Sequence, residues 1–187
     1  MTEPLVVIWD GVEEPSQERC TIVDLQEIHI AGVVRGNFGT CTYAMTVSQE
    51  WLFHSLRVTL GDRTLAVSRS GAVWTVDGEQ RPDLSTAREV DISISPISNT
   101  LPIRRLGLEL GASADIVTAY VRVPELTVTT DPQRYTRTAA REYRYDSRDT
   151  DFTRFVTVDE HGLVVEYPGL FRRRNNSGGA LDSTAHS

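Results

Sequence analysis

The sequence predicts a mainly β protein: a strongly curved antiparallel sheet or half-barrel of about a dozen strands, with one short buried helix. Short runs rich in β-branched and aromatic residues recur along the 187 residues, each bounded by Gly, Pro, Asp or Ser. One stretch, 99–110, has convincing helical spacing, and no βαβ pattern occurs. So many strands usually curl or close, because an open flat sheet exposes long edges to other chains.

The strands are expected where apolar and polar residues alternate, or where a short apolar run lies between turn signals. Asp77-Gly78 is the strongest hairpin signal in the chain. The run 21–35 is either one long strand or two strands joined at a bend. The expected strands are 5–9, 21–35, 40–47, 51–60, 64–69, 72–76, 90–94, 116–123, 126–130, 133–138, 141–147, 152–158 and 163–167.

The helix is expected to begin at Asn99 or Thr100, since a short polar side chain can accept a hydrogen bond from a free backbone N–H. Pro102 then lies in the first turn, where its missing N–H costs nothing. Apolar residues fall on two opposed sides of this helix, which is typical of a buried one. We therefore expect it inside the curved sheet or across its mouth. The segment 106–110 also alternates, so it is either the end of the helix or a strand.

Length and composition predict one domain over residues 1–174, large enough to bury a core, and a Gly/Ser/Asn-rich flexible tail over 175–187. The formal net charge of −7 argues against a nucleic-acid partner, which normally needs a basic patch. Every basic residue is Arg, which excludes Schiff-base lysine chemistry and P-loop phosphate binding. No apolar run is long enough to cross a membrane.

The N-terminal segment has neither a basic region nor a long apolar core, so we expect no signal peptide and a cytoplasmic location. Cys20 and Cys41 are then expected to be reduced thiols in strands. The four histidines, at positions 29, 54, 161 and 186, show no metal-ligand spacing with them. We predict neither a metal nor another cofactor.

Several phrases of the chain together resemble the bacterial putative glycolipid-binding family. The most specific is Asn-Thr-Leu-Pro-Ile-Arg-Arg-Leu at 99–106. The other phrases are 43–51, 74–78, 90–92, 133–135, 143–147, 162–164 and 167–170. The resemblance covers nearly the whole chain except the tail. The sequence departs from the family pattern at Asp146, where Glu is expected, and at Phe171, where Trp is expected.

The resemblance implies a strongly curved antiparallel sheet, forming a partial or closed barrel, with a helix associated with it. The family's fold is similar to that of bacterial lipoprotein-localisation factors. The resemblance therefore implies an amphiphilic small molecule or lipid as the binding partner.

Arg104 and Arg105 are the first candidates for ligand contact, because a planar guanidinium can bind a phosphate or carboxylate bidentately. The alternative is a structural ion pair with Asp91 or Glu109, since an unpaired buried charge is very costly. Asn99 beside them is a further ligand candidate or a helix cap. Asp91 is also a ligand-binding candidate. With Glu109 it could do acid–base work, but no spacing singles out such a pair and we assign no catalytic residue.

Aromatic residues supply the second group of candidates. Tyr135, Tyr143 and Tyr145 could line a pocket, presenting apolar rings and a wet hydroxyl to an amphiphile, or could be ordinary cross-strand packing. Trp51 and Trp74 could stack on a sugar ring or pack in the core. Gln133 could reach a sugar hydroxyl or be solvated at a strand end.

The leading functional hypothesis is a non-catalytic binding protein for an amphiphilic small molecule, possible ligands being a glycolipid or a related lipid metabolite. Apolar strand faces would bury the acyl portion at about 25 cal/mol per Å². One alternative is an enzyme acting on a small hydrophobic or sugar-containing substrate, which requires at least two convergent titratable groups in a cavity. The other is an interaction scaffold with a filled core. The sequence makes no prediction of oligomeric state.

Overall fold

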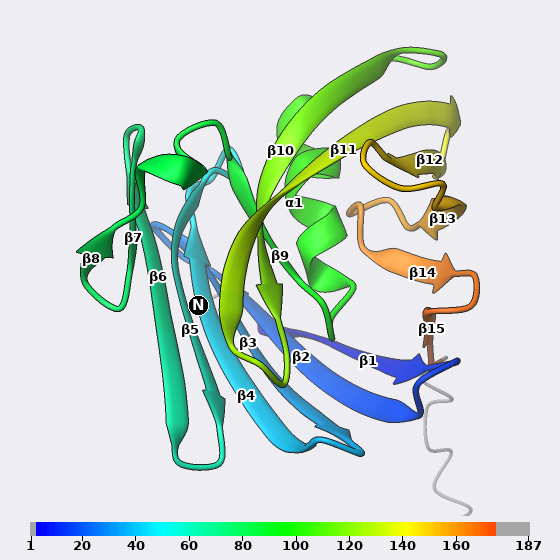
Figure 1. Ribbon diagram of the computed structural model, residues 1–187. Coiled ribbons are helices and arrows are strands. Elements are labelled where there is room, and N and C mark those ends of the chain that lie inside the picture. The colour runs from blue at the N-terminus through cyan, green and yellow to red at the C-terminus, as the bar shows by residue number, and fades with distance from the viewer. Residues whose placement is uncertain (1–2, 175–187) are drawn as a thin grey trace, which may run out of the picture.

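A computed structural model describes residues 3–174 and confirms a mainly β fold with one α-helix (Figure 1). The expected tail at 175–187, with His186, lies outside the described residues. A 3₁₀ turn η1 spans Pro82–Leu84 and helix α1 spans Ile97–Leu106. The strands are β1 (Leu5–Gly11), β2 (Ser16–Asp24), β3 (Ile28–Gly36), β4 (Gly39–Val47), β5 (Phe53–Leu60), β6 (Arg63–Ser70), β7 (Val73–Val76), β8 (Glu79–Gln80), β9 (Glu89–Ile92), β10 (Ser113–Arg122), β11 (Thr127–Ala139), β12 (Glu142–Ser147), β13 (Thr153–Val158), β14 (Val164–Tyr167) and β15 (Phe171–Arg173).

All these strands belong to one large curved sheet in the order β8-β7-β6-β5-β4-β3-β2-β1-β15-β14-β13-β12-β11-β10-β9. Neighbouring strands are antiparallel except β9 and β10, which run parallel. The sheet is open and does not close into a barrel. Strand β1 pairs with β2 on one side and with the C-terminal β15 on the other, so it joins the two halves of the sheet.

The described chain has 15 strands where about a dozen were expected. The run 21–35 divides into β2 and β3, which reverse at residues 25–27 and pair with each other from Ser16↔Gly36 to Asp24↔Ile28. Conversely, the two expected strands at 126–130 and 133–138 form the single strand β11. Its Pro132 does not interrupt the pairing with β10.

The core lies on the concave side of the sheet and follows the alternation of the strands. On β3, Ile28, Ile30 and Val34 are buried and their immediate neighbours are more exposed. Tyr43 on β4 lies opposite Gly32 and covers it, because a side chain at position 32 would overlap the tyrosine ring. This close packing carries the Tyr43 hydroxyl to the buried carboxylate of Glu18 on β2, to which it donates a hydrogen bond.

Helix α1 lies within the curve of the sheet (Figure 1), and every residue from Ile97 to Ile103 is buried. It begins after Pro96, so Asn99 and Thr100 lie in its first turn and neither is the cap. It ends at Leu106, and Gly107 follows in the left-handed conformation at φ 51°. Residues 107–110 therefore form neither more helix nor a strand, because the left-handed glycine turns the chain away.

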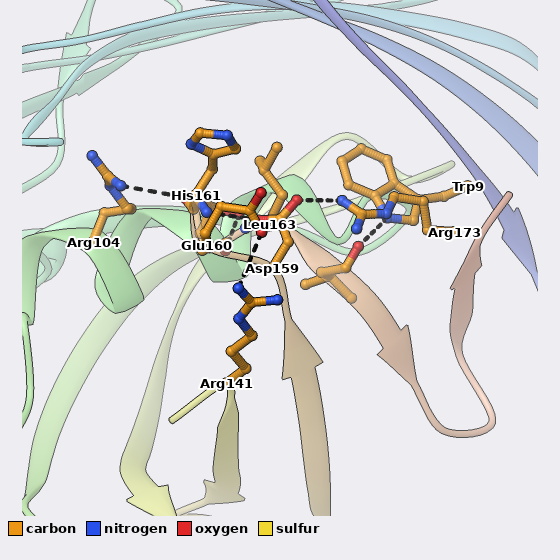
Figure 2. A network of polar contacts seen from close by, with 11 residues as sticks. Trp9, Arg104, Arg141, Asp159, Glu160, His161, Leu163 and Arg173 are labelled. Carbon is orange, nitrogen blue, oxygen red and sulfur yellow. Dashed lines mark hydrogen bonds and ion pairs between the residues drawn. The ribbon is translucent and has the colours of Figure 1, made fainter. Parts of the chain in front are cut away.

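The turn between β13 and β14 holds the helix in place through polar contacts, several of which are drawn in Figure 2. The Thr100 hydroxyl donates to the Gly162 carbonyl at 3.0 Å. Asp159 accepts from the backbone N–H groups of His161 and Leu163, at 2.9 and 3.0 Å. Its other oxygen pairs with Arg173 of β15 at 2.5 Å, so one carboxylate ties the turn to the last strand.

Candidate ligand-binding site

A cavity of about 370 Å³ lies between the part of the sheet that runs from β15 to β9 and the segment that links β9 to α1. Its wall comes from β9, β10, β11, β12, β14 and β15, together with residues 93–99. Polar and aromatic side chains predominate. The lining side chains that the argument below uses are Asp91, Asn99, Tyr120, Arg122, Asp131, Tyr145, Asp149, Phe152, Tyr167, Leu170 and Phe171.

Two carboxylates in this wall share one amide. The Gln133 side-chain nitrogen donates to Asp91 at 2.8 Å and to Asp131 at 2.6 Å, so the two acids converge on the same point. Asp91 also accepts from the Ser98 hydroxyl at 3.0 Å. Because Asp91 lies on β9 and Asp131 on β11, the intervening strand β10 brings them together through its pairing with both neighbours.

Burial is the main influence on the acidity of this pair. It raises the pKa of Asp91 to about 6, against the opposing effect of the Gln133 hydrogen bond, and the neighbouring charge of Asp131 adds to the rise. Burial also raises the pKa of Asp131. Two carboxyl groups with raised pKa values therefore face one cavity, which is an arrangement frequent at functional sites.

Aromatic rings form another part of the wall. Tyr145 makes an edge contact with Tyr135, with ring centroids 5.5 Å apart, and a tilted contact with Tyr167 at 6.1 Å. Phe152 lies 5.9 Å from Tyr145, and Phe171 lies 6.4 Å from Tyr167. Rings held by several neighbours in this way form a rigid apolar surface beside the acids.

The hydroxyl groups of Tyr145 and Tyr167 have no hydrogen-bond partner among residues 3–174, although the two residues are only 7% and 5% exposed. Both residues line the cavity. Burial raises the pKa of each hydroxyl, and the charges of Asp91 and Asp131 raise it further, while the charge of Arg154 opposes the rise at Tyr167. The two side chains are mostly buried, but their hydroxyl oxygens are open to the cavity, so they are available to a ligand.

Of the residues chosen from the sequence, Asp91, Asn99 and Tyr145 come together in this cavity wall. Gln133 and Tyr135 lie directly behind it: Gln133 bridges the acids, and the Tyr135 hydroxyl accepts from the Asn99 amide at 2.8 Å. Both are 1% exposed, so neither is solvated or at a free strand end.

The remaining sequence candidates lie outside this cavity wall. The expected partner of a structural ion pair was Asp91 or Glu109. Arg105 instead pairs with the fully buried Glu89. The Arg104 guanidinium lies 5.3 Å from the centre of the Trp51 ring. Trp74 stacks on Phe53 at 5.2 Å in the main core, and Tyr143 is buried in the aromatic cluster without lining the cavity.

Sequence reasoning missed Asp131 and Tyr167, the partners of Asp91 and Tyr145. A signal for the first was available, because Asp131 shares the two-residue period of Gln133 and Tyr135 on one strand. It also missed Glu18, a carboxylate that is 2% exposed and hydrogen-bonded to Ser95 at 2.7 Å. Glu18 shares a strand face with Cys20 and Ile22, so the same period would have placed it in the core.

Fold and cavity define a class of protein: an open, curved β-sheet that wraps one helix and leaves a polar and aromatic hollow beside it. The family profile described as "Putative glycolipid-binding" matches residues 6–173, and the chain belongs to that family. A crystal structure of a DUF1089 family protein from Pseudomonas aeruginosa is similar, with 31% sequence identity and a TM-score of 0.75. The similarity covers 85% of this chain and 92% of that one. No curated protein matches the chain.

Two further observations concern membranes and metals. In the part of the chain that the structure describes, no helix has the length and apolar character needed to cross a bilayer. Nor do three His, Cys, Asp or Glu side chains gather within residues 3–174 in a way that could hold a metal ion.

Proposed function

We propose that the protein is a non-catalytic binding protein for an amphiphilic small molecule of the glycolipid type, with the polar headgroup in the cavity beside α1. The observation that carries this proposal is the pair of hydroxyls of Tyr145 and Tyr167, which have no hydrogen-bond partner within residues 3–174 and line the same cavity as Asp91 and Asp131. Sugar hydroxyls both donate and accept hydrogen bonds, so they suit this mixture of carboxylate, amide and phenol groups.

The apolar part of the ligand is assigned to the aromatic side of the cavity. Phe152, Leu170 and Phe171 lie there, each partly buried. Each Å² of apolar surface that they remove from water contributes about 25 cal/mol. The family match supports a lipid-like ligand, and the cytoplasmic location and bacterial origin expected from the sequence remain part of the proposal.

The roles proposed for the candidate residues differ. Asp91, Asp131, Asn99, Tyr145 and Tyr167 contact the ligand, and Gln133 and Tyr135 position them. Arg105 acts in folding through its pair with Glu89, and Arg104 and the tryptophans act away from the ligand.

Titration of n-octyl β-D-glucoside below its critical micelle concentration, followed by calorimetry, tests the proposal. The Tyr145→Phe, Tyr167→Phe double variant should weaken binding about tenfold, because each phenol contributes a hydrogen bond. Tyr143→Phe is the matched control, since Tyr143 lies on the same strand as Tyr145 and is equally buried but does not line the cavity. Equal affinity in the double variant and the control would contradict the assignment, and absence of binding by the unchanged protein would contradict the proposed function.

A second candidate function, hydrolysis of a glycosidic bond, is favoured by the convergence of Asp91 and Asp131. Both acids contact the same amide nitrogen, so they are close together, as in retaining glycosidases. One carboxyl group would protonate the leaving oxygen while the other attacks the sugar carbon, and water would then hydrolyse the glycosyl-enzyme. Incubation with a series of 4-nitrophenyl glycosides decides between the two. Release of nitrophenol that disappears in Asp131→Asn supports the enzyme, and binding of octyl glucoside without release supports the carrier. The hollow itself argues against a scaffold with a filled core.

A further inference from the structure

The charges at the cavity are unbalanced. Three carboxylates, those of Asp91, Asp131 and Asp149, line it together with a single guanidinium, that of Arg122. Within residues 3–174 neither Asp91 nor Asp131 forms an ion pair, and the side chains that donate hydrogen bonds to them are neutral. The acid pair therefore lacks a positive partner from the protein.

Several other acids of the described chain pair with an arginine. Glu89 is fully buried and pairs with Arg105, and Asp159, with a side chain 14% exposed, pairs with Arg173. The exposed Asp115 has two arginines, Arg134 and Arg148. Glu18 is also buried without a cation, but it does not line the cavity. Because Asp91 and Asp131 do line it, a cation from outside can reach them and lower the cost of keeping them ionised.

The rings around the acid pair also favour a cation. Aromatic faces attract positive charge within about 6 Å of the ring centre. Two rings of this wall already hold one, since the Arg154 guanidinium lies 4.5 Å from the centre of Phe152 and that of Arg122 lies 6.0 Å from the centre of Tyr120. The rings of Tyr145 and Tyr167 hold no guanidinium in the described chain, and their hydroxyls are unpartnered.

We propose that the headgroup bound in this cavity carries a protonated amine, seated between the carboxylates of Asp91 and Asp131 and the phenols of Tyr145 and Tyr167. This inference rests on the proposed function and narrows its ligand to an amine-bearing amphiphile, such as a lipid-linked amino sugar. An ammonium group has three donors and no acceptor, which suits two carboxylates and two phenol oxygens. A neutral head leaves the acids uncompensated, and an anionic head is repelled by them.

Three probes with the same octyl chain test the inference by calorimetry, slightly below neutral pH where the sugar amine is protonated. They are octyl 2-amino-2-deoxy-β-D-glucoside, octyl β-D-glucoside and octyl β-D-glucuronide, which are cationic, neutral and anionic. The amino sugar should bind at least about tenfold more tightly than the glucoside, and the glucuronide should bind most weakly.

Two variants test which carboxylate causes any preference for the amino sugar over the glucoside. Asp131→Asn keeps the shape of the side chain and removes one charge, so the affinity for the amino sugar should fall by a larger factor than the affinity for the glucoside, and the amino sugar should lose most of its advantage. Asp115→Asn is the matched control, because it changes the net charge equally but Asp115 lies outside the cavity wall. The control should retain the full preference.

The outcomes separate this inference from the proposed function. If the glucoside and the amino sugar bind equally well, the carrier function stands and the amine assignment is overturned. A preference that Asp115→Asn reduces as much as Asp131→Asn reflects only the overall negative charge of the protein and overturns the assignment too. If no octyl probe binds, both proposals fail.

Discussion

Single buried acids decide much of the chemistry of this chain, because each finds a different kind of partner. Glu18 accepts hydrogen bonds from two hydroxyls, those of Tyr43 and Ser95. Glu89 pairs with the guanidinium of Arg105. Asp91 accepts from an amide and a hydroxyl and faces the cavity. Hydroxyl and amide donors compensate a buried charge less than a guanidinium does, so Glu18 and Asp91 remain sensitive to pH.

The pH dependence of stability is one consequence of the Glu18 environment. Burial raises the pKa of Glu18 to about 7, although the Tyr43 and Ser95 hydrogen bonds oppose the rise. A raised acid pKa means that the folded state holds its proton more tightly, so this contribution to stability is present at low pH and is lost as pH rises through about 7. Glu18→Gln should therefore become more stable relative to the unchanged protein between pH 5 and pH 8. Urea unfolding at pH 5 and pH 8 measures the difference in unfolding free energy between the two proteins. The same difference at both pH values would contradict the prediction.

The ion pair of Arg105 gives a prediction about folding. Arg105→Ala leaves the carboxylate of Glu89, whose side chain is fully buried, without its cation. Removing one partner of a buried pair typically costs about 3–5 kcal/mol of unfolding free energy. Arg57→Ala, at an exposed position on β5, should change it by less than about 0.5 kcal/mol. Adding Glu89→Gln to Arg105→Ala should recover part of the loss in urea unfolding, and a stable single variant would show that the pair is dispensable.

At the scale of elements, close contacts between neighbours position the helix and the inner face of the sheet. Thr100 of α1 is fully buried and donates to the carbonyl of Gly162 in the β13–β14 turn. Strand β3 supplies Gly32 where the Tyr43 ring of β4 must pass. The first contact depends on the Thr100 hydroxyl and the second on the missing side chain of Gly32, so a single substitution can test each.

Gly32→Ala is expected to destabilise the protein by about 1–3 kcal/mol, because a methyl group at position 32 displaces the Tyr43 ring and with it the hydrogen bond to Glu18. Ala31→Ser changes the adjacent residue on the opposite, exposed face of β3 and should be nearly neutral. Thermal unfolding of the two variants measures the effect. Equal melting temperatures would mean that the ring has room to move.

At the scale of the whole molecule, the sheet has two halves, β1 to β8 and β9 to β15. They meet where β1 pairs with β15. The pairs Trp9↔Arg173 and Gly11↔Phe171 form that junction, and Arg174 pairs with Asp10 at 2.6 Å. Phe171 also lines the cavity. The junction therefore belongs both to the sheet and to the candidate site.

Removal of β15 tests the junction. A chain that ends at Gly169 loses the strand that joins β1 to β14, and we expect it to lose cooperative thermal unfolding, because both new edges expose unpaired backbone groups. A chain that ends at Arg174 keeps β15 and serves as the comparison. Circular dichroism during heating distinguishes them, and a cooperative transition in the shorter chain at the same temperature would show that the halves fold separately.

Much of the architecture was predictable from local pattern. The two-residue alternation and the turn signals predicted the curved β-sheet, and the two-sided apolar spacing predicted that α1 is buried. Where local pattern failed, a distant contact had decided one result. Asn99 resembles a cap but donates to the distant Tyr135 hydroxyl. The alternation at 106–110 misled for a local reason, because Leu106 ends the helix and Gly107 is left-handed.

The sequence by itself therefore determined the class of fold and the buried helix, because periodicity and turn chemistry act between near neighbours. It also brought Asp91, Asn99 and Tyr145 forward as candidates. Only the tertiary structure decided that Asp91 shares an amide with Asp131, that Arg105 is bound to Glu89, and that Tyr145 and Tyr167 line one cavity with the two acids. Those relations depend on strand order and on the curvature of the sheet, which bring together residues far apart in the chain.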